Sequence, residues 1–270
     1  MTRTSPAFSP ARVAALVLRY LYLLRSSWPR LLELIYWPAM QLLVWGFLQS
    51  YIARNASTPA LVAGTFVGSV LLWDILFRGQ MGFSITFLEE MWSRNMGNLM
   101  MSPLRPTEFV LALMAMSLVR LAIGMLPVTA MALFFFGFNL YGFGLALVFF
   151  FVNLILTSWA VGIVVSGLIL RNGMGAEGLA WSLMFLMMPL ACVYYPVATL
   201  PAVLRPVAWA LPPTYVFEGM RALVIDHVLR ADLMLTAFAI NAALFAVAVL
   251  VFVRLLDGAR RQGMLMQMGE

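Results

Sequence analysis

The chain of 270 residues contains no lysine, one cysteine and one histidine. Without lysine it cannot supply the phosphate-binding lysine of a Walker-type ATPase or a Schiff-base nucleophile. Cys192 has no partner for an internal disulfide, and Cys192 and His227 together fall short of the usual ligand set for zinc. We therefore expect no catalytic residue, no metal site and no cofactor in this chain.

Charged residues are also scarce, at 10% of the chain, whereas hydrophobic residues make up 63%. The mean hydropathy of +0.95 is too high for an ordinary water-soluble domain. Apolar runs of about twenty residues or more recur, which is the length that crosses roughly 30 Å of hydrocarbon. The predicted fold class is an all-α membrane protein with a single transmembrane domain over residues 1–270.

Six transmembrane helices are predicted from these runs, at about 31–52, 60–88, 108–136, 143–170, 179–196 and 233–253. Pro38 should kink the first of them. The second is longer than a bilayer requires, so its cytoplasmic end should project into water.

Residues 10–30 combine apolar positions at helical spacing with regularly placed arginines. This pattern is typical of an amphipathic helix at the membrane surface, and the alternative is that the segment simply begins the first span. Arginines spread through residues 1–30 also argue against a cleaved signal peptide.

The distribution of arginine predicts the orientation, because loops on the cytoplasmic side are enriched in positive charge. With the first residues inside, twelve arginines, Arg78 among them, are assigned to the cytoplasmic side, and four, at positions 54, 205, 221 and 230, to the outside. Both termini are then cytoplasmic. The arginines are scattered over separate loops, so membrane lipids rather than nucleic acid are their expected partners.

Residues 197–221 are too polar to span a membrane and too apolar to be a free loop. The prolines at 201, 206, 212 and 213 argue against a regular crossing helix, and hence against a seven-span layout. We predict re-entrant helices in the outer leaflet that shape an exit, the alternative being a passive surface cap. The predicted exit-gate residues are Pro212, Pro213, Tyr215, Glu218 and Arg221.

Two charged residues, Asp74 and Arg120, fall at similar depth inside predicted antiparallel spans. Intramembrane charges are rare and often functional, so we predict that the two pair, for helix register or for substrate. Aromatic residues are abundant and serve mostly in packing and interface belts. The candidates for lining a pathway are Trp37, Trp45, Tyr194 and Tyr195.

The polar stretch 89–106 resembles a segment of ABC-2 export permeases, in which glutamates precede a Gly-Thr/Asn-Leu step and then Ser/Thr-Pro. The matching residues are Glu89, Glu90, Gly97, Asn98, Leu99, Ser102 and Pro103. Residues 211–215 and 218–221 resemble the family's proline-aromatic stretch and its Glu-Gly-Met/Leu-Arg ending. The pairs at 37–38 and 45–46 look like the branch of nodulation-type lipo-oligosaccharide, multidrug and polysaccharide exporters. Met100 and Met101 depart from the pattern, since an acidic residue often follows the leucine.

The resemblance implies the permease subunit of an ATP-driven exporter in a bacterial inner membrane. A homodimer of permeases would work with two copies of a separate ABC ATPase, which binds ATP and Mg²⁺. Stretch 89–106 would be a coupling helix that seats on the ATPase, the alternative being a solvated loop. The coupling residues implied are Glu89, Glu90, Arg94, Gly97, Asn98, Leu99 and Pro103. The cargo would be a glycolipid, lipo-oligosaccharide, polysaccharide or hydrophobic drug.

Two other classes of protein compete with this interpretation. An ion- or proton-coupled secondary transporter should carry carboxylates in several spans, and only Asp74 lies well inside one. An intramembrane enzyme would need clustered histidine, cysteine, aspartate or serine–lysine groups, and the sequence shows no such cluster.

Overall fold

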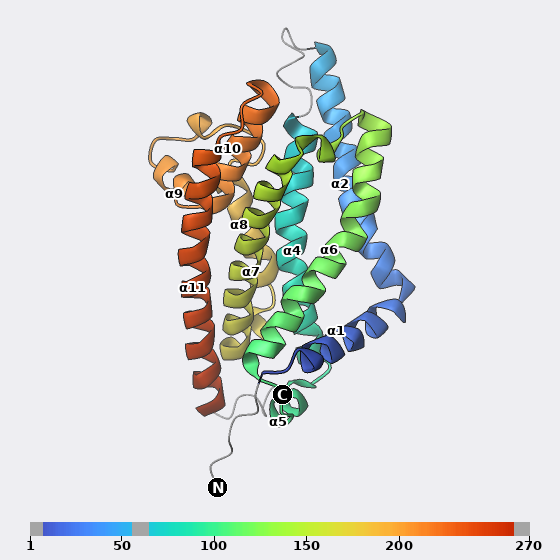
Figure 1. Ribbon diagram of the computed structural model, residues 1–270, viewed down its shortest axis with the longest axis vertical. Coiled ribbons are helices and arrows are strands. Elements are labelled where there is room, and N and C mark those ends of the chain that lie inside the picture. Colours follow the sequence, from blue (N-terminus) through green and yellow to red (C-terminus); the bar gives the residue numbers. More distant parts are fainter. Residues whose placement is uncertain (1–7, 56–64, 262–270) are drawn as a thin grey trace.

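A computed structural model describes residues 8–55 and 65–261, and every element in these ranges is a helix. Long helices run alternately between the two ends of the molecule (Figure 1). They are α2 (Trp28–Asn55), α4 (Thr65–Trp92), α6 (Pro106–Phe136), α7 (Leu145–Asn172) and α11 (Ala231–Arg261). The shorter helices are α1 (Pro10–Arg25), α5 (Met96–Met101), α8 (Leu179–Leu190), α9 (Arg205–Trp209) and α10 (Pro212–Ile225), with single turns η1 (Leu140–Phe143), η2 (Met174–Ala176) and η3 (Val197–Thr199).

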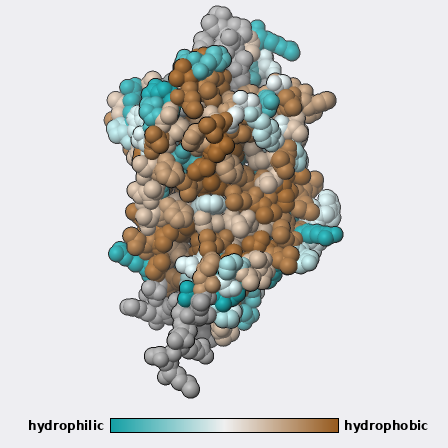
Figure 2. All heavy atoms as spheres, in the orientation of Figure 1, coloured by the Kyte–Doolittle hydropathy of each residue, from teal (hydrophilic) through white to brown (hydrophobic). Residues whose placement is uncertain are grey.

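Brown apolar side chains form a broad belt across the face of the molecule in view, and teal polar ones gather towards its two ends (Figure 2). Within the described ranges, α2, α6, α7 and α11 are long and apolar enough to cross a membrane. Helix α4 has comparable length but is not among these candidates, and it is mostly buried inside the bundle. Helix α8, with 12 residues, extends only about 18 Å. The all-α membrane class is confirmed, and the count of six spans stays a prediction.

Several helix ends differ from the predicted ones. The helical structure is interrupted at Ser26, between α1 and α2. Helix α2 bends along its length and has Pro38 inside it (Figure 1). Helix α4 continues to Trp92, and its predicted start at 60–64 lies outside the described residues. The predicted span 179–196 is wrong at its end: the helix stops at Leu190, because Pro189 removes a donor and Cys192 adopts a left-handed φ of 54°.

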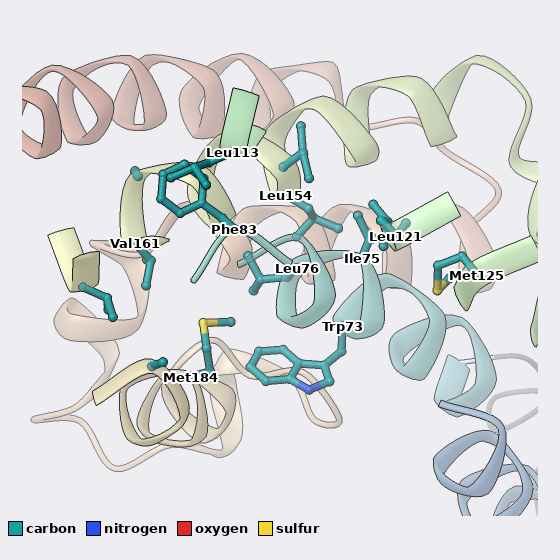
Figure 3. Packing of buried hydrophobic residues seen from close by; sticks show 14 of the residues in the cluster. Trp73, Ile75, Leu76, Phe83, Leu113, Leu121, Met125, Leu154, Val161 and Met184 are labelled. Carbon is teal, nitrogen blue, oxygen red and sulfur yellow. The ribbon is translucent and has the colours of Figure 1, made fainter. Parts of the chain in front are cut away.

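Helix α4 is the centre of the packing, and small residues let its neighbours approach closely. A Cβ on Gly79 would lie 2.9 Å from Ser158 Oγ of α7, and one on Gly82 would lie 3.1 Å from the Ser117 Cα of α6. Close backbone approach of this kind drives helix association in lipid, where apolar burial alone gives no advantage. Figure 3 shows Trp73, Leu76 and Phe83 of α4 in the apolar core that results.

Hydrogen bonds between helices lock this arrangement. Ser158 Oγ of α7 donates to the Leu76 carbonyl of α4 at 2.7 Å. Asn241 Nδ2 of α11 donates to Asn153 Oδ1 of α7 at 3.1 Å, and Thr157 Oγ1 donates to Asn241 Oδ1 at 2.7 Å. All of these side chains are buried. Polar contacts of this kind hold helices in register where an unpaired polar group would be costly.

The ends of the molecule carry different elements. The tip helix α5 lies at one end, which α1 also approaches, and α9 and α10 lie at the other (Figure 1). We refer to them as the α5 end and the α10 end. Helix α6 begins at the α5 end with Pro106, and its terminus is capped by Glu108, whose carboxylate accepts from the Arg105 N–H at 3.0 Å.

Candidate functional site

Helix α1 lies across the α5 end and is fastened there by two arginines, seven residues apart. Arg12 donates to Glu108 through Nε at 2.9 Å and Nη2 at 2.6 Å. Glu108 Oε1 also accepts from the Ser9 N–H at 2.8 Å. Hydrogen bonding to the buried carboxylate raises the pKa of the Arg12 guanidinium above its ordinary value. Arg12 therefore binds the beginning of α6 through a charged, two-bond contact.

Arg19 makes the second fastening, to the last turn of α4. Its two Nη atoms donate to Glu90 at 2.6 and 3.3 Å. Glu90 is buried, and its Oε2 also accepts from Asn95 Nδ2 at 2.7 Å. Because Asn95 immediately precedes α5, Glu90 joins three segments at one carboxylate: α1, α4 and the start of α5.

Glu89 provides a third ionic contact at this end. Its Oε2 accepts from Arg120 Nη2 of α6 at 2.7 Å, and its Oε1 lies 3.5 Å from Arg30 Nη1 of α2. Glu89 thus connects α4 to α2 and α6. We define the base clamp as the three carboxylates and their arginines: Glu89, Glu90, Glu108, Arg12, Arg19, Arg30 and Arg120.

Helix α5 projects from the base clamp. Arg94, Asn98, Met101 and Pro103 are exposed, and Met101 is 79% exposed. Gly97 and Leu99 are half-buried, and Met96 is buried against the bundle. The segment therefore has one side packed on the protein and one side free for a partner.

The coupling residues implied by the resemblance thus fall into three groups, one of which is the half-buried pair Gly97 and Leu99. Glu89 and Glu90 belong to α4 and are engaged by arginines of the same chain, so they do not form an outward contact surface. Arg94, Asn98 and Pro103 are exposed around α5.

Four residues of the base clamp were not among the predicted site residues: Arg12, Arg19, Arg30 and Glu108. The sequence does carry signals for Arg12, Arg19 and Glu108. Two arginines stand seven residues apart on an amphipathic helix, and an acid occupies the third position of a helix that starts with proline.

The predicted pair of Asp74 and Arg120 is wrong. In the described residues, Asp74 Oδ1 lies 3.5 Å from Arg78 Nε, one turn along α4, and Arg120 binds Glu89 instead. Arg78, which the orientation assigned to the cytoplasmic side, lies at the middle of α4 and is 12% exposed. The two charged groups are not at the same depth, because Arg120 reaches Glu89, which lies fifteen residues, or about 22 Å, along α4 from Asp74.

The unburied residues of α4 form one stripe. Phe66, Phe77, Arg78, Met81, Ile85 and Glu89 are half-buried, while most other residues of the helix are buried. At 100° per residue they fall within a sector of about 140°. Phe66 stacks near Trp45 of α2, and Phe77 packs against Phe185 of α8, with ring centroids 6.3 and 5.9 Å apart. We call this the α4 stripe; its aromatic residues contact α2 and α8.

Two of the four aromatic pathway candidates lie at one end of the α4 stripe. The rings of Trp45 and Tyr194 stack with centroids 4.3 Å apart, and Phe66 lies 6.5 Å from Tyr194. Trp37 instead points away from the bundle, 60% exposed on α2. Tyr195 donates its hydroxyl to the Pro189 carbonyl at 2.8 Å and packs in a separate small cluster.

The predicted exit-gate residues hold the α10 end together. Glu218 Oε1 accepts from the Val197 N–H at 2.7 Å and from Arg221 Nη2 at 3.1 Å. Tyr215 donates to the Trp209 carbonyl at 2.8 Å. Pro212 and Pro213 are buried at the first turn of α10, where proline is well tolerated.

A pocket of about 680 Å³ lies at the α10 end. Its lining includes Tyr194, Trp209, Glu218, Arg221, Asp226 and Arg230. Tyr194 also belongs to the aromatic stack, so one wall of the pocket leads to the α4 stripe. We call it the outer pocket. It brings an aromatic wall together with two acids and two arginines.

Among the described residues, no group of three or more histidine, cysteine, aspartate or glutamate side chains could hold a metal ion. The arrangement offers instead a base clamp, an exposed tip helix, a central stripe and an outer pocket. Such an arrangement suits the transmission of movement and the binding of cargo.

Comparison with family models gives a match to the ABC-2 type transporter model over residues 22–225, from the last turn of α1 to the end of α10. Comparison with curated proteins gives no match. The matched region contains α5, the α4 stripe and the exit-gate residues. It covers well over half of the chain and confirms the family that the motifs at 89–103 and 211–221 indicated. The chain belongs to the ABC-2 type transporter family and is a multi-pass membrane component of a transporter.

Proposed function

We propose that this chain is the permease subunit of an ATP-driven exporter. Two copies pair with two copies of a separate ABC ATPase and move an amphipathic cargo outward across a bacterial inner membrane. The observation that carries the proposal is the base clamp, which ties both ends of the exposed α5 segment to helices of the bundle. ATP and Mg²⁺ bind the partner, and this chain supplies the movement and the path.

The clamp favours transmission of force because α5 is attached on both sides. On the α4 side, Asn95 and Arg19 hold Glu90. On the α6 side, Arg12 and the Arg105 N–H hold Glu108. Arg12 and Arg19 are two helical turns apart, about 10.5 Å along α1. A push on α5 therefore displaces α1, α4 and α6 together.

The surface that contacts the ATPase is then the exposed side of α5. Arg94, Asn98 and Met101 supply a cation, an amide and a flexible apolar side chain, a composition common at protein interfaces. Asp74 is the only carboxylate of α4 that is not part of the base clamp. A secondary transporter would use several such groups, so ATP-driven transport has more support.

The experiment tests this surface with two matched substitutions. Met101→Asp places a charge on the exposed side of α5, where the side chain is 79% exposed. Val203→Asp places the same charge at the α10 end, where the side chain is 83% exposed. We expect Met101→Asp to reduce co-purification of the neighbouring ATPase by about tenfold or more, equivalent to about 1.4 kcal/mol. Val203→Asp should co-purify like the wild type. Equal recovery with both variants would contradict the proposal.

A further inference from the structure

Asp74 and Arg78 lie side by side on α4, with hydrogen-bonding capacity that the described residues leave unused. Neither Asp74 oxygen accepts a hydrogen bond there, and Arg78 Nε donates none, although all three atoms are buried. Buried polar groups are normally paired, and the 3.5 Å contact between Arg78 Nε and Asp74 Oδ1 leaves this pair with capacity for a further polar partner. Because Asp74 is fully buried and Arg78 is 12% exposed, the outer N–H groups of the guanidinium are what a ligand can reach.

Charge balance decides which kind of ligand fits. The buried Asp74 pairs with Arg78, and the exposed Glu33 of α2 adds a weaker electrostatic attraction to the same guanidinium. An anionic group would add a third negative charge in a site of low dielectric. A cationic group would be repelled by the positively charged guanidinium, which donates hydrogen bonds and accepts none. An uncharged group with oxygen acceptors satisfies Arg78 without either penalty.

The outer pocket likewise carries no excess of positive charge. Of its lining residues, Arg221 pairs with Glu218 of the lining, and Arg230 pairs with Asp232. The stacked rings of Trp45, Phe66 and Tyr194 connect this pocket with the α4 stripe. A cargo that passes along the stripe to the pocket therefore meets aromatic faces and arginines that are already paired with carboxylates, with no excess of positive charge.

We propose that Arg78, held in place by Asp74, binds an uncharged, oxygen-rich head group of the cargo, such as a sugar, at the middle of α4. The inference deepens the proposed function, on which it rests for the statement that the ligand is transported. Arg78 contacts the ligand, and Asp74 is a positioning residue that also neutralises the guanidinium.

Binding to the purified full-length chain tests the proposal without the ATPase. The chain in phosphatidylcholine nanodiscs is titrated with an alkyl maltoside, an alkyl phosphate and an alkyl trimethylammonium salt of equal chain length. Affinity is measured from the shift in melting temperature, since a ligand that binds the folded state raises it. We expect the maltoside to bind about tenfold more tightly than either charged amphiphile. Equal affinities for the three would overturn the proposal.

Three variants assign the effect to the two residues. Arg78→Met should weaken maltoside binding about tenfold, and Arg78→Lys, which keeps the charge but loses the planar fork, should weaken it less. Asp74→Asn should strengthen alkyl phosphate binding until it is within about threefold of maltoside binding, because one opposing carboxylate is neutralised. The matched control Arg171→Met removes an exposed arginine at the end of α7 and should change none of the affinities.

The outcomes separate this inference from the proposed function. Unchanged maltoside affinity in Arg78→Met or Arg78→Lys would overturn the head-group site, even if the ATPase co-purifies. Failure of the ATPase to associate would overturn the proposed function, while the binding titration would still report whether Arg78 recognises an uncharged head group.

Discussion

At the scale of single residues, the chain uses arginine where a flat, two-bond contact is needed. Arg12 and Arg19 each bind one buried carboxylate through two nitrogen atoms. A lysine ammonium is a point charge and could not reproduce this geometry. The absence of lysine from the sequence is therefore compatible with a base clamp that depends on guanidinium groups.

Glu90 provides the sharpest test of the base clamp. Glu90→Gln keeps an oxygen for Asn95 but removes the charge that binds Arg19. We expect a loss of about 2 kcal/mol in the free energy of unfolding, because Arg19 is partly exposed and regains water. In the assembled transporter, the ATPase should still co-purify, and cargo should no longer stimulate ATP hydrolysis.

The control for this prediction is Glu177→Gln. Glu177 also accepts a hydrogen bond from a residue of the last turn of α4, Trp92 Nε1 at 3.0 Å, but the contact is exposed. Its loss should cost less than about 1 kcal/mol and leave stimulation unchanged. If Glu90→Gln retained full stimulation by cargo, the base clamp would have no part in coupling.

At the scale of helices, the sequence was sufficient to predict that the elements are helices and roughly where each one lies in the chain. Hydrophobic runs indicated the long helices, and arginine spacing indicated α1. The pairing of Asp74 with Arg120 failed because the arginine side chain extends towards Glu89 at the α5 end, and the direction of a long side chain cannot be counted along a sequence. The pair that formed, Asp74 with Arg78, has a spacing of four residues, and this spacing could have been recognised in the sequence as one that brings two side chains together on a helix.

The polar residues at 89–90 show a different kind of error. Two adjacent glutamates after an apolar run predict a solvent-exposed break. The structure continues the helix through Glu89 and Glu90, because arginines of α1, α2 and α6 neutralise them. These partners come from positions up to 71 residues away in the chain, a distance over which local patterns carry no information.

Helix α4 should be the element least tolerant of added volume. A methyl group on Gly79 would lie 2.7 Å from Ile155 Cδ1 and 2.9 Å from Ser158 Oγ, and so would disturb the bond from Ser158 to Leu76. We expect Gly79→Ala to reduce the free energy of unfolding by about 1 to 3 kcal/mol. Thermal unfolding of the purified chain measures this.

A second glycine supplies the comparison. A methyl group on Gly258 of α11 would meet no heavy atom of the described residues within 4 Å, so only helix propensity should matter there. Gly258→Ala should be neutral or stabilising by up to about 1 kcal/mol. A loss of similar size at both positions would mean that the close approach of α4 and α7 does not limit stability.

At the scale of the whole molecule, function requires the two ends to face different compartments. The α5 end carries the base clamp and the exposed tip, and the α10 end carries the outer pocket and the exit-gate residues. The family establishes a multi-pass membrane protein but not which end is inside. The excess of arginine on the α5 side of the predicted topology favours a cytoplasmic α5.

Labelling with a membrane-impermeant maleimide decides the orientation. The single cysteine, Cys192, is buried and can be replaced by alanine to give a background free of thiols. In that background, Met101→Cys and Val203→Cys place thiols at positions that are 79% and 83% exposed, at opposite ends of the molecule. We expect intact cells to label only Val203→Cys, and permeabilised cells to label both. Labelling of Met101→Cys in intact cells would place α5 outside, where no ATPase could reach it, and would remove the basis for ATP-driven export.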